Sequence, residues 1–417
     1  MKKVTFAVIG MGSRGRAYAS RQKYFPDEME VTAAADTRRE QLLSAQSFLN
    51  LPEDRLFDSA DAILAAPKLA DVMIISTQDA QHADHAVRAM EKGYDLILEK
   101  PASNTIEGCL RIRDTAERLG RKVLVCHVLR YTAFYSAIKK MIADGAVGKL
   151  ESIEMAEHVG YYHIAHSFVR GNWHRKEDSS PMILAKCCHD LDLMVWLTGK
   201  HCEKLSSFGS LDFFKESNAP LGSTERCTDG CPYYDTCPYC AERFYLEVMP
   251  EWPADILAPD PTPDKIKKAV RNTDYGRCVF RMDNDVVDHQ TVNFLMEDGI
   301  TVSFTMCGFS NRIDRTIRIM GTEGEIWGNM ESQKIYSQRF HEEVKEYDCN
   351  AENLEAEGHG GGDTGLVRDA IRYFRGDDFD SSSITTIDRS IESHLMAFAA
   401  EESRLGGGKV MDMKKFG

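Results

Sequence analysis

The sequence of 417 residues has no apolar run of the ~18 residues that a membrane-spanning helix requires. It also lacks a basic run that would offset its formal net charge of −14. Such an acidic balance repels nucleic acid and anionic membranes. We find no internal repeat and no low-complexity linker in it. These absences argue against membrane, nucleic-acid-binding and repeat proteins, so we expect a globular protein whose partner is a small molecule.

A secretory signal is also disfavoured. The apolar run from Val4 to Met11 follows two lysines, and Ala17-Tyr18-Ala19 has the small residues of a cleavage site. However, Arg14 and Arg16 interrupt the apolar centre that such a signal needs. The twelve cysteines are then expected as reduced thiols rather than as a disulfide framework. We therefore expect a cytoplasmic protein.

The stretch Gly10-Met11-Gly12-Ser13-Arg14-Gly15 has the G-x-G-x-x-G spacing of a dinucleotide-binding loop. It lies between a strand-forming segment, 4–8, and a segment without helix breakers, 14–23, which is the context that the motif requires. The first glycine permits a tight turn, the second lets the backbone approach the pyrophosphate, and the third allows close helix packing. The loop therefore predicts a nucleotide site.

The next predicted strand, 29–35, ends in Asp36. A carboxylate at this place accepts hydrogen bonds from the ribose 2′-hydroxyl of NAD. Arg38 and Arg39 follow and could neutralise the 2′-phosphate of NADP. Asp36 favours NAD, and NADP stays the alternative.

Strand and helix patterns alternate through the first 130 residues, which predicts an α/β fold with a doubly wound parallel sheet. Ligands of such sheets lie at the carboxyl ends of the strands, so we expect Thr77, Glu99, Lys100 and His127 beside the cofactor. Further strands are predicted at 70–77, 94–99 and 122–129, and helices at 80–92 and 105–119.

The pattern changes after about residue 130. Two β-rich runs, 286–296 and 300–309, flank Glu297-Asp298-Gly299, which is a hairpin signal. We predict a Rossmann domain over 1–130 and an α+β domain over 131–417, with an open, mostly antiparallel sheet, a cysteine-rich insertion at about 222–245, and a C-terminal helix returning to the first domain. Its other strands are expected at 151–160, 205–214, 315–320, 324–330 and 334–340, and its helices at 365–374 and 387–405.

Glu99-Lys100-Pro101 follows the strand at 94–99. Pro101 restricts Lys100 to an extended or turn conformation, so its amine is expected to point towards the nicotinamide. A desolvated amine there can exchange a proton with a substrate hydroxyl. The alternative is a surface lysine paired with Glu99, and the sequence leaves both open.

Residues 180–199 have helical periodicity. Lys186, His189 and Asp190 then share one face, because they are three and four positions apart. A histidine on such a face can relay a proton. The alternative is an exposed Lys186–Asp190 ion pair beside a packed histidine.

Four cysteines lie within CTDGCPYYDTCPYC, at Cys227, Cys231, Cys237 and Cys240. Four thiolates can hold a structural zinc ion or an iron–sulfur cluster. Their spacing matches neither pattern closely, so buried or free thiols are an equal alternative.

Together these features resemble the glucose-fructose oxidoreductase, inositol dehydrogenase and rhizopine-catabolism (Gfo/Idh/MocA) family of oxidoreductases. The resemblance covers nearly the whole chain and implies a Rossmann domain, an open-sheet domain that mediates assembly into a dimer or tetramer, and hydride transfer between NAD(P) and a sugar, polyol or glycoside. It rests on the loop at 10–15, the helix opening Thr77-Gln78-Asp79-Ala80-Gln81-His82, the Glu99-Lys100-Pro101 motif, and His189 followed by Asp192 and Trp196.

The resemblance implies that Lys100 and His189 are catalytic. Motifs and resemblance together give these cofactor-binding residues: Gly10, Gly12, Ser13, Arg14, Gly15, Asp36, Thr77, His82, Glu99 and Lys100. Polar or flat groups that suit a carbohydrate give these substrate-binding residues: Tyr131, His163, His166, Arg170, Trp173, Lys186, Asp190, His359 and Asp363.

One position departs from the family. Members of the inositol dehydrogenase type carry an aspartate four residues before the histidine, where this chain has Ala185. Two alternatives to a dehydrogenase follow. Some relatives cleave glycosides by oxidation, elimination, hydration and reduction without consuming NAD, and a regulator that senses NAD or a sugar would need no turnover.

Overall fold

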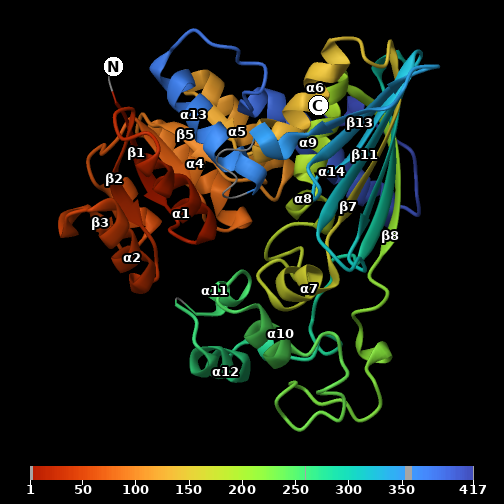
Figure 1. The fold of residues 1–417 in the computed structure, drawn as a ribbon. Helices are drawn as coiled ribbons and strands as arrows, with labels where there is room; N and C mark the ends of the chain where they lie inside the picture. The colour runs from red at the N-terminus through yellow and green to blue at the C-terminus, as the bar shows by residue number, and fades with distance from the viewer. Residues whose placement is uncertain (1–2, 259, 353–358, 417) are drawn as a thin grey trace.

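The computed structural model describes residues 3–258, 260–352 and 359–416. The first domain contains a six-stranded sheet in the order β3-β2-β1-β4-β5-β6, with every pair parallel (Figure 1). This arrangement confirms the predicted doubly wound sheet. Its strands are β1 (Val4–Ile9), β2 (Met29–Ala35), β3 (Leu56–Phe57), β4 (Val72–Ile75), β5 (Asp95–Leu98) and β6 (Val123–Val125).

The helices of the first domain follow from local signals. In α5, for example, Thr105 caps the first turn by accepting a hydrogen bond from the Gly108 amide, and Gly120 ends the helix in the left-handed conformation. Two predicted elements are shorter than expected: the helix at 14–23 gives way to a 3₁₀ turn at Ser20, and the last strand stops at Val125. The helices are α1 (Ser13–Ala19), α2 (Arg39–Leu49), α3 (Ala60–Ala65), α4 (His82–Glu91) and α5 (Ile106–Leu119).

The second sheet has nine strands in the order β14-β13-β12-β11-β7-β10-β9-β8-β15. Only β7 and β10 pair in parallel, so the sheet is mostly antiparallel, as predicted. The expected hairpin joins β9 and β10, with Asp298 at a φ of 60°. The strands are β7 (Leu150–His158), β8 (Cys202–Ser210), β9 (His289–Met296), β10 (Thr301–Cys307), β11 (Asp314–Gly321), β12 (Gly324–Asn329), β13 (Lys334–Arg339), β14 (Lys345–Asp348) and β15 (Met411–Asp412).

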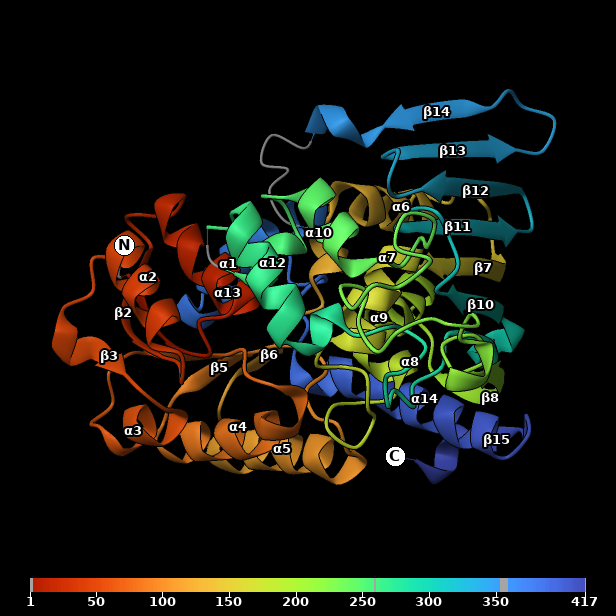
Figure 2. The ribbon, with the colours of Figure 1, turned by 90° about the horizontal axis from the view of Figure 1, so that it is seen from below.

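Helices from the second half of the chain connect the two sheets. Helix α14 (Ile387–Leu405) packs on β8 and α9 and also on α5 of the first domain, as Figure 2 shows. Helix α13 (Gly362–Arg375) contacts α1 and β1. One cluster of buried side chains therefore contains residues of both domains. Four further helices lie between the two sheets in the chain: α6 (Ala133–Ala143), α7 (Tyr161–His163), α8 (Met182–Ala185) and α9 (Cys188–Thr198).

Three helices, α10 (Ala241–Val248), α11 (Ala254–Leu257) and α12 (Pro263–Asn272), lie between β8 and β9 in the chain. They have a small core of their own, built around Tyr245 and Ile266, and Figure 1 shows them below α7, apart from both sheets. We call the segment 211–288, which contains them, the helical insertion. Among the described residues, no helix combines the length and apolar character needed to cross a membrane.

Candidate active site

The glycine loop after β1 leaves room for a dinucleotide. Gly10 has a φ of +92°, and a Cβ there would lie 2.5 Å from the Ser76 carbonyl oxygen. A Cβ on Gly15 would lie 1.9 Å from the Gly10 carbonyl oxygen, so both positions require glycine. The nearest atom to a Cβ on Gly12 is 3.7 Å away, on the Arg38 side chain. Two glycines thus shape the turn, while Gly12 leaves backbone open to the pyrophosphate of NAD.

Asp36 holds this loop in place. Its Oδ2 accepts a hydrogen bond from the Met11 amide at 2.8 Å, and its Oδ1 accepts one from the Arg38 amide at 2.8 Å. Ionised carboxylate oxygens can accept further hydrogen bonds, so Asp36 can still bind a ribose. Ser13 is exposed at the first position of α1.

Arg14 joins the cofactor crevice to the start of helix α13. It donates to Glu99 at 2.8 Å and to the two oxygens of Asp363 at 2.6 and 3.1 Å. Burial raises the pKa of Glu99, but the charges of Arg14 and Lys100 outweigh it and keep that pKa below its ordinary value. The structure therefore places Asp363 with the predicted cofactor residues Arg14 and Glu99. The backbone of His359 begins the turn before α13, and its side chain lies outside the described residues.

His82 links two turns at the carboxyl edge of the sheet. Its ring nitrogens lie 3.0 Å from the Thr77 carbonyl oxygen and 2.7 Å from that of Pro101. The hydroxyl of Thr77 in turn contacts His85 at 3.1 Å. His82 thus fixes the turn that carries Lys100 relative to the end of β4.

The amine of Lys100 reaches across to the second domain. Its Nζ donates to the Ala185 carbonyl oxygen at 2.7 Å, and it makes no ion pair with Glu99, whose Oε2 instead accepts from the Lys100 amide. The predicted helix over 180–199 is in fact two helices, because the backbone departs from helical geometry at Cys187. Ala185 ends α8, so its carbonyl lacks an intrahelical donor and can accept from Lys100.

Lys186 and Asp190 do not pair with each other, although the sequence offered that pair as an alternative. Lys186 lies 3.2 Å from Glu157, while Asp190 binds Arg315 at 2.8 Å. Arg315 also binds Glu157 at 2.6 Å, so the four side chains form one buried network. Burial lowers the pKa of Lys186; Glu157 opposes this effect, and the charges of Arg315 and Lys100 add to it. This site thus contains, in addition to the Lys100 amine, the amine of Lys186, whose pKa is lowered.

Glu157 and Arg315 were not predicted from the sequence, yet a signal was present. Glu157 follows Ile153 and Met155 at alternate positions of β7, and Arg315 begins the same alternation in β11. A charged residue on the core-facing side of a strand is rare unless it is paired. The two residues are direct neighbours across the sheet, which the sequence alone did not show.

Three buried histidines meet behind Lys100. The ring centroid of His127 lies 5.6 Å from that of His189 and 5.7 Å from that of His394. His394 accepts a hydrogen bond from the Ala102 amide at 2.8 Å. Burial lowers the pKa of His394 to about 3 and that of His127 well below its ordinary value. Both rings are therefore neutral at pH 7, and His189 lies beside them on α9.

The predicted substrate residues fall into two groups. His163 lies near Lys186, and its ring is 4.8 Å from that of Trp252 in the helical insertion. Trp173 donates to Asp79 at 3.4 Å, directly after the Thr77 turn. These residues lie on the side of the active site that faces the insertion.

The other substrate predictions lie in packed surroundings. His166 contacts the Tyr245 hydroxyl at 2.8 Å, and Arg170 donates to the carbonyl oxygens of Tyr239 and Arg277 at 2.7 and 2.8 Å. Both therefore hold the helical insertion. Tyr131 is half-buried and packs with the core of the first domain.

The buried histidines predict loss of stability in acid. His166 and His394 have a pKa of about 3 in the folded protein, against ~6.5 when unfolded. The unfolded state binds more protons between these values, so the free energy of unfolding falls as the pH decreases from about 6.5, by about 1.4 kcal/mol per pH unit for each histidine. Urea unfolding between pH 7 and pH 5 checks this slope. His394→Gln should reduce this slope by the contribution of one proton. An unchanged slope contradicts the low pKa of His394.

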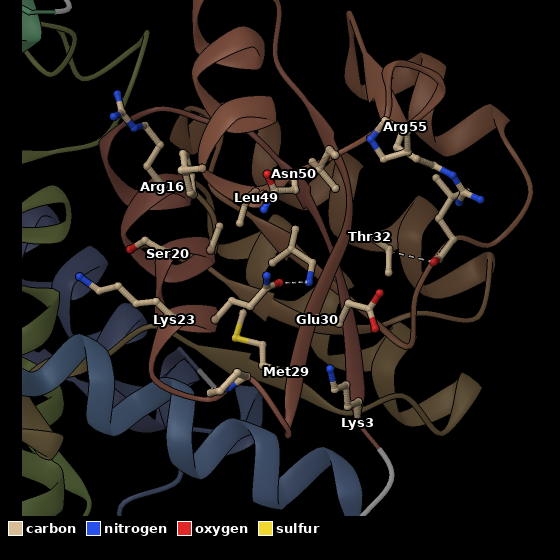
Figure 3. Close-up of a pocket in the computed structure, with 18 of the residues that line it drawn as sticks. Lys3, Arg16, Ser20, Lys23, Met29, Glu30, Thr32, Leu49, Asn50 and Arg55 are labelled. Atoms are coloured by element: carbon tan, nitrogen blue, oxygen red, sulfur yellow. Dashed lines mark hydrogen bonds between the residues drawn. The ribbon is translucent and has the colours of Figure 1, made fainter.

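A groove of about 1120 Å³ lies elsewhere on the first domain (Figure 3). It contains none of the predicted site residues and borders the amino end of β2 at Met29 and Glu30. Ligands of doubly wound sheets lie at the opposite, carboxyl edge. This groove therefore lies at the edge of the sheet opposite Lys100.

The structure does not support the zinc prediction. Among the described residues, no three His, Cys, Asp or Glu side chains are arranged as metal ligands. All the cysteines that the structure describes are free.

Comparisons with known proteins agree with this geometry. Residues 4–127 match the family model "Oxidoreductase family, NAD-binding Rossmann fold", and residues 135–229 match "GFO/IDH/MocA C-terminal domain". Together the two matches cover more than half of the chain.

Individual relatives are more distant. The chain is 25% identical over 330 residues to "Putative oxidoreductase YteT" of Bacillus subtilis, which covers 75% of this chain and 74% of that protein. It is 29% identical over 142 residues to an inositol 2-dehydrogenase of Klebsiella pneumoniae, which covers 34% of this chain and 42% of that enzyme.

Among solved structures, an oxidoreductase from Agrobacterium radiobacter in complex with NAD+, L-tartaric acid and magnesium has the same fold. Its TM-score is 0.71 at 14% identity, with 99% of each chain covered. Both family models, the two sheets and the glycine loop lead to one conclusion. The chain belongs to the Gfo/Idh/MocA family of oxidoreductases.

Proposed function

We propose that this oxidoreductase moves a hydride between NAD and a hydroxyl-bearing carbon of a sugar, polyol or glycoside. The observation that carries the proposal is the position of the Lys100 amine. It lies at the carboxyl edge of the nucleotide-binding sheet and donates to Ala185 of the second domain at 2.7 Å. A basic group between a cofactor crevice and a second domain is suited to take the proton of a substrate hydroxyl.

Each residue has a role in this proposal. When bound, NAD+ supplies the hydride acceptor. Lys100 accepts the proton of the hydroxyl, and His189 orients the same hydroxyl by a hydrogen bond. His163 and Trp252, whose rings lie 4.8 Å apart, contact the substrate, because flat groups suit sugar faces.

We further propose NAD rather than NADP as the cofactor. The Asp36 carboxylate faces the loop at Met11 and would repel a 2′-phosphate. Arg38 and Arg39 are the arguments for NADP, but the Arg38 side chain is 61% exposed and Arg39 pairs with Glu53. Titration with both nucleotides tests the choice, and tighter binding of NADP contradicts it.

Substitution of Gly12 should weaken cofactor binding without changing the stability of the folded protein. In Gly12→Ala the added methyl group meets only Arg38, at 3.7 Å, so the melting temperature should stay within about 2 °C. The methyl group occupies the approach of the pyrophosphate, so the Kd for NAD should rise at least about tenfold, or 1.4 kcal/mol. Scanning calorimetry measures the melting temperature, and calorimetric titration measures the Kd. As a control, Gly93→Ala adds a methyl group that meets nothing within 4 Å but strains the backbone at a φ of +91°, so it should lower the melting temperature and leave the Kd unchanged. Equal affinities of Gly12→Ala and the wild type contradict the loop assignment.

A second candidate function is redox-neutral glycoside hydrolysis. Oxidation of a ring hydroxyl acidifies the neighbouring C–H, a base removes that proton, and the aglycone leaves before water adds and the hydride returns. This series of steps needs one base to take the hydroxyl proton and a second base to take the C–H proton. The observation that favours this candidate is a second amine, that of Lys186. Burial and the charge of Lys100 both lower the pKa of Lys186.

One assay distinguishes the candidates. A panel of sugars, polyols and nitrophenyl glycosides is incubated with the protein and NAD+, and NADH absorbance and aglycone release are recorded together. Accumulating NADH supports the dehydrogenase. Aglycone release with catalytic NAD+ and no accumulating NADH supports the hydrolase. Tight NAD binding with neither product supports a non-catalytic sensor and rejects both enzymatic proposals.

We also propose that the chain works in the cytoplasm as a homo-oligomer. Buried thiols such as Cys187 and Cys188 suit a reducing compartment. The strands β9 and β10 expose alternate polar side chains such as Thr291 and Thr305, which offers a broad sheet face for a second copy. Light scattering after size-exclusion chromatography tests the assembly, and a monomeric mass rejects it.

A further inference from the structure

Charged side chains from three distant segments meet at the carboxyl end of β5. Arg14, in the first turn of α1, donates to Glu99 at 2.8 Å and to the two oxygens of Asp363 at 2.6 and 3.1 Å. The other oxygen of Glu99 accepts from the Lys100 amide at 2.7 Å. Asp363 lies in the first turn of α13. We call Arg14, Glu99, Lys100 and Asp363 the charge cluster.

Both carboxylates of the charge cluster are buried and ionised. The side chain of Glu99 is 7% exposed and that of Asp363 is 1% exposed. Burial raises the pKa of Glu99, but the charges of Arg14 and Lys100 outweigh burial and keep that pKa below its ordinary value. Asp363 faces the Arg14 guanidinium with both oxygens, which is the geometry of a charged pair. With Lys100 protonated, two negative charges therefore face two positive charges.

Tyr18 belongs to the same contacts but adds no charge. Its hydroxyl donates to Glu99 at 2.6 Å and accepts from Arg14 at 2.6 Å. Burial keeps the pKa of Tyr18 well above its ordinary value, so the phenol is neutral at pH 7. The balance of the charge cluster thus depends on its two carboxylates.

This balance affects the two forms of the cofactor differently. The nicotinamide ring of NAD+ has a positive charge, and that of NADH has none. Without one carboxylate, the charge cluster would have a net positive charge while Lys100 is protonated. A positive charge in a partly desolvated crevice disfavours the arrival of a second one. Loss of a carboxylate should therefore weaken the binding of NAD+ more than that of NADH.

We propose that Asp363 favours the oxidised form of the bound cofactor, because its carboxylate offsets one of the two cations of the charge cluster and lets NAD+ bind beside Lys100. The inference rests on the proposed binding of NAD at the glycine loop. Asp363 is predicted from the sequence as a substrate residue, whereas in this proposal it acts on the cofactor through charge. It needs no contact with the reacting atoms.

A purely structural role for Asp363 is the alternative, because its contact with Arg14 also joins α13 to α1. Such a contact would support the crevice for both forms of the cofactor, which share the adenosine, pyrophosphate and ribose groups. Its loss would change both Kd values by the same factor. The ratio of the Kd for NAD+ to the Kd for NADH therefore distinguishes the two roles.

The test uses the full-length protein and calorimetric titration with NAD+ and with NADH at pH 7. Asp363→Asn keeps the size of the side chain and removes its charge. The ratio of the Kd for NAD+ to the Kd for NADH should rise at least about threefold, the effect of one unit charge across a solvated crevice. Asp363→Glu retains the charge and should keep the ratio of the wild type.

Asp369→Asn is the matched control. It removes the same charge from the same helix, but about 9 Å further along the helix axis, where the carboxylate pairs with Arg368 at 3.0 Å. The Kd ratio of this variant should equal that of the wild type. A ratio that rises equally in Asp363→Asn and Asp369→Asn contradicts a specific role for Asp363.

A measurement on the wild type keeps the test decisive if Asp363→Asn does not fold. Because the charge cluster is balanced, NAD+ should bind no more than about fivefold more weakly than NADH, and a larger difference overturns the proposal. An unchanged ratio in folded Asp363→Asn also overturns it and leaves the proposed function intact. Failure of the wild type to bind either nucleotide rejects the proposed function together with this inference.

Discussion

Lys100→Ala should lower kcat by about 10²- to 10⁴-fold, the range that a general base contributes. The amine is placed by two features that an alanine leaves intact: the turn fixed by His82 and the Ala185 carbonyl oxygen, 2.7 Å from Nζ. The loss should therefore appear in kcat, while the Kd for NAD stays within about twofold because the glycine loop is untouched. Steady-state kinetics on the active substrate and calorimetric titration with NAD measure the two effects.

Lys68→Ala is the matched control for this substitution. Lys68 also lies in the first domain and also donates its amine to a backbone carbonyl, that of Gly93, at 2.7 Å. Lys68 precedes the amino end of β4, at the edge of the sheet opposite Lys100, so its loss should leave kcat unchanged. A wild-type rate for Lys100→Ala would remove the proposed proton transfer, whichever substrate is used.

Glu157→Gln should lower the free energy of unfolding by about 3–5 kcal/mol, the cost of removing one partner from a buried ion pair. The carboxylate faces Lys186 at 3.2 Å and Arg315 at 2.6 Å, and none of its side chain is exposed. Glutamine keeps the volume but leaves the two cations with Asp190 as their only acidic partner in the network. Urea unfolding at pH 7 measures the effect.

Glu154→Gln is the control, because Glu154 lies on the same strand with its side chain exposed, and it should change stability by less than about 0.5 kcal/mol. The double variant Glu157→Gln/Lys186→Met should recover part of the loss, since it removes a cation together with its partner. Equal unfolding midpoints for Glu157→Gln and the wild type contradict the buried network.

Local sequence patterns predicted much of the site. The glycine loop depends on turn geometry and on close contacts with β4, so the residues at 10 and 15 have to be glycine. The apolar run of β4 and the capped helix α5 are also readable from neighbouring residues. These features depend on steric contacts, hydrophobic burial and hydrogen bonds between neighbouring residues, so the spacing of residues in the sequence predicts them.

Contacts between residues that lie far apart in the chain could not be predicted from local sequence patterns. Arg14 and Asp363 are 349 positions apart, and Ala102 and His394 are 292 apart. The sequence identified Arg14 and Asp363 as functional residues but assigned them to different ligands. His166 and Arg170 are predicted sugar contacts, and the sequence did not predict that they also contact Tyr245 and Tyr239 of the helical insertion.

The sequence by itself determined the two kinds of sheet, the nucleotide loop and the position of Lys100 at a strand end, because each depends on the periodicity and conformation of adjacent residues. Only the tertiary structure decided which charges meet in the interior. β7, β11 and α9 bring Glu157, Arg315 and Asp190 together, and the break after α8 gives Lys100 a carbonyl partner. A buried charge needs a partner wherever the fold can supply one, and strand order and helix packing, not spacing along the chain, select that partner.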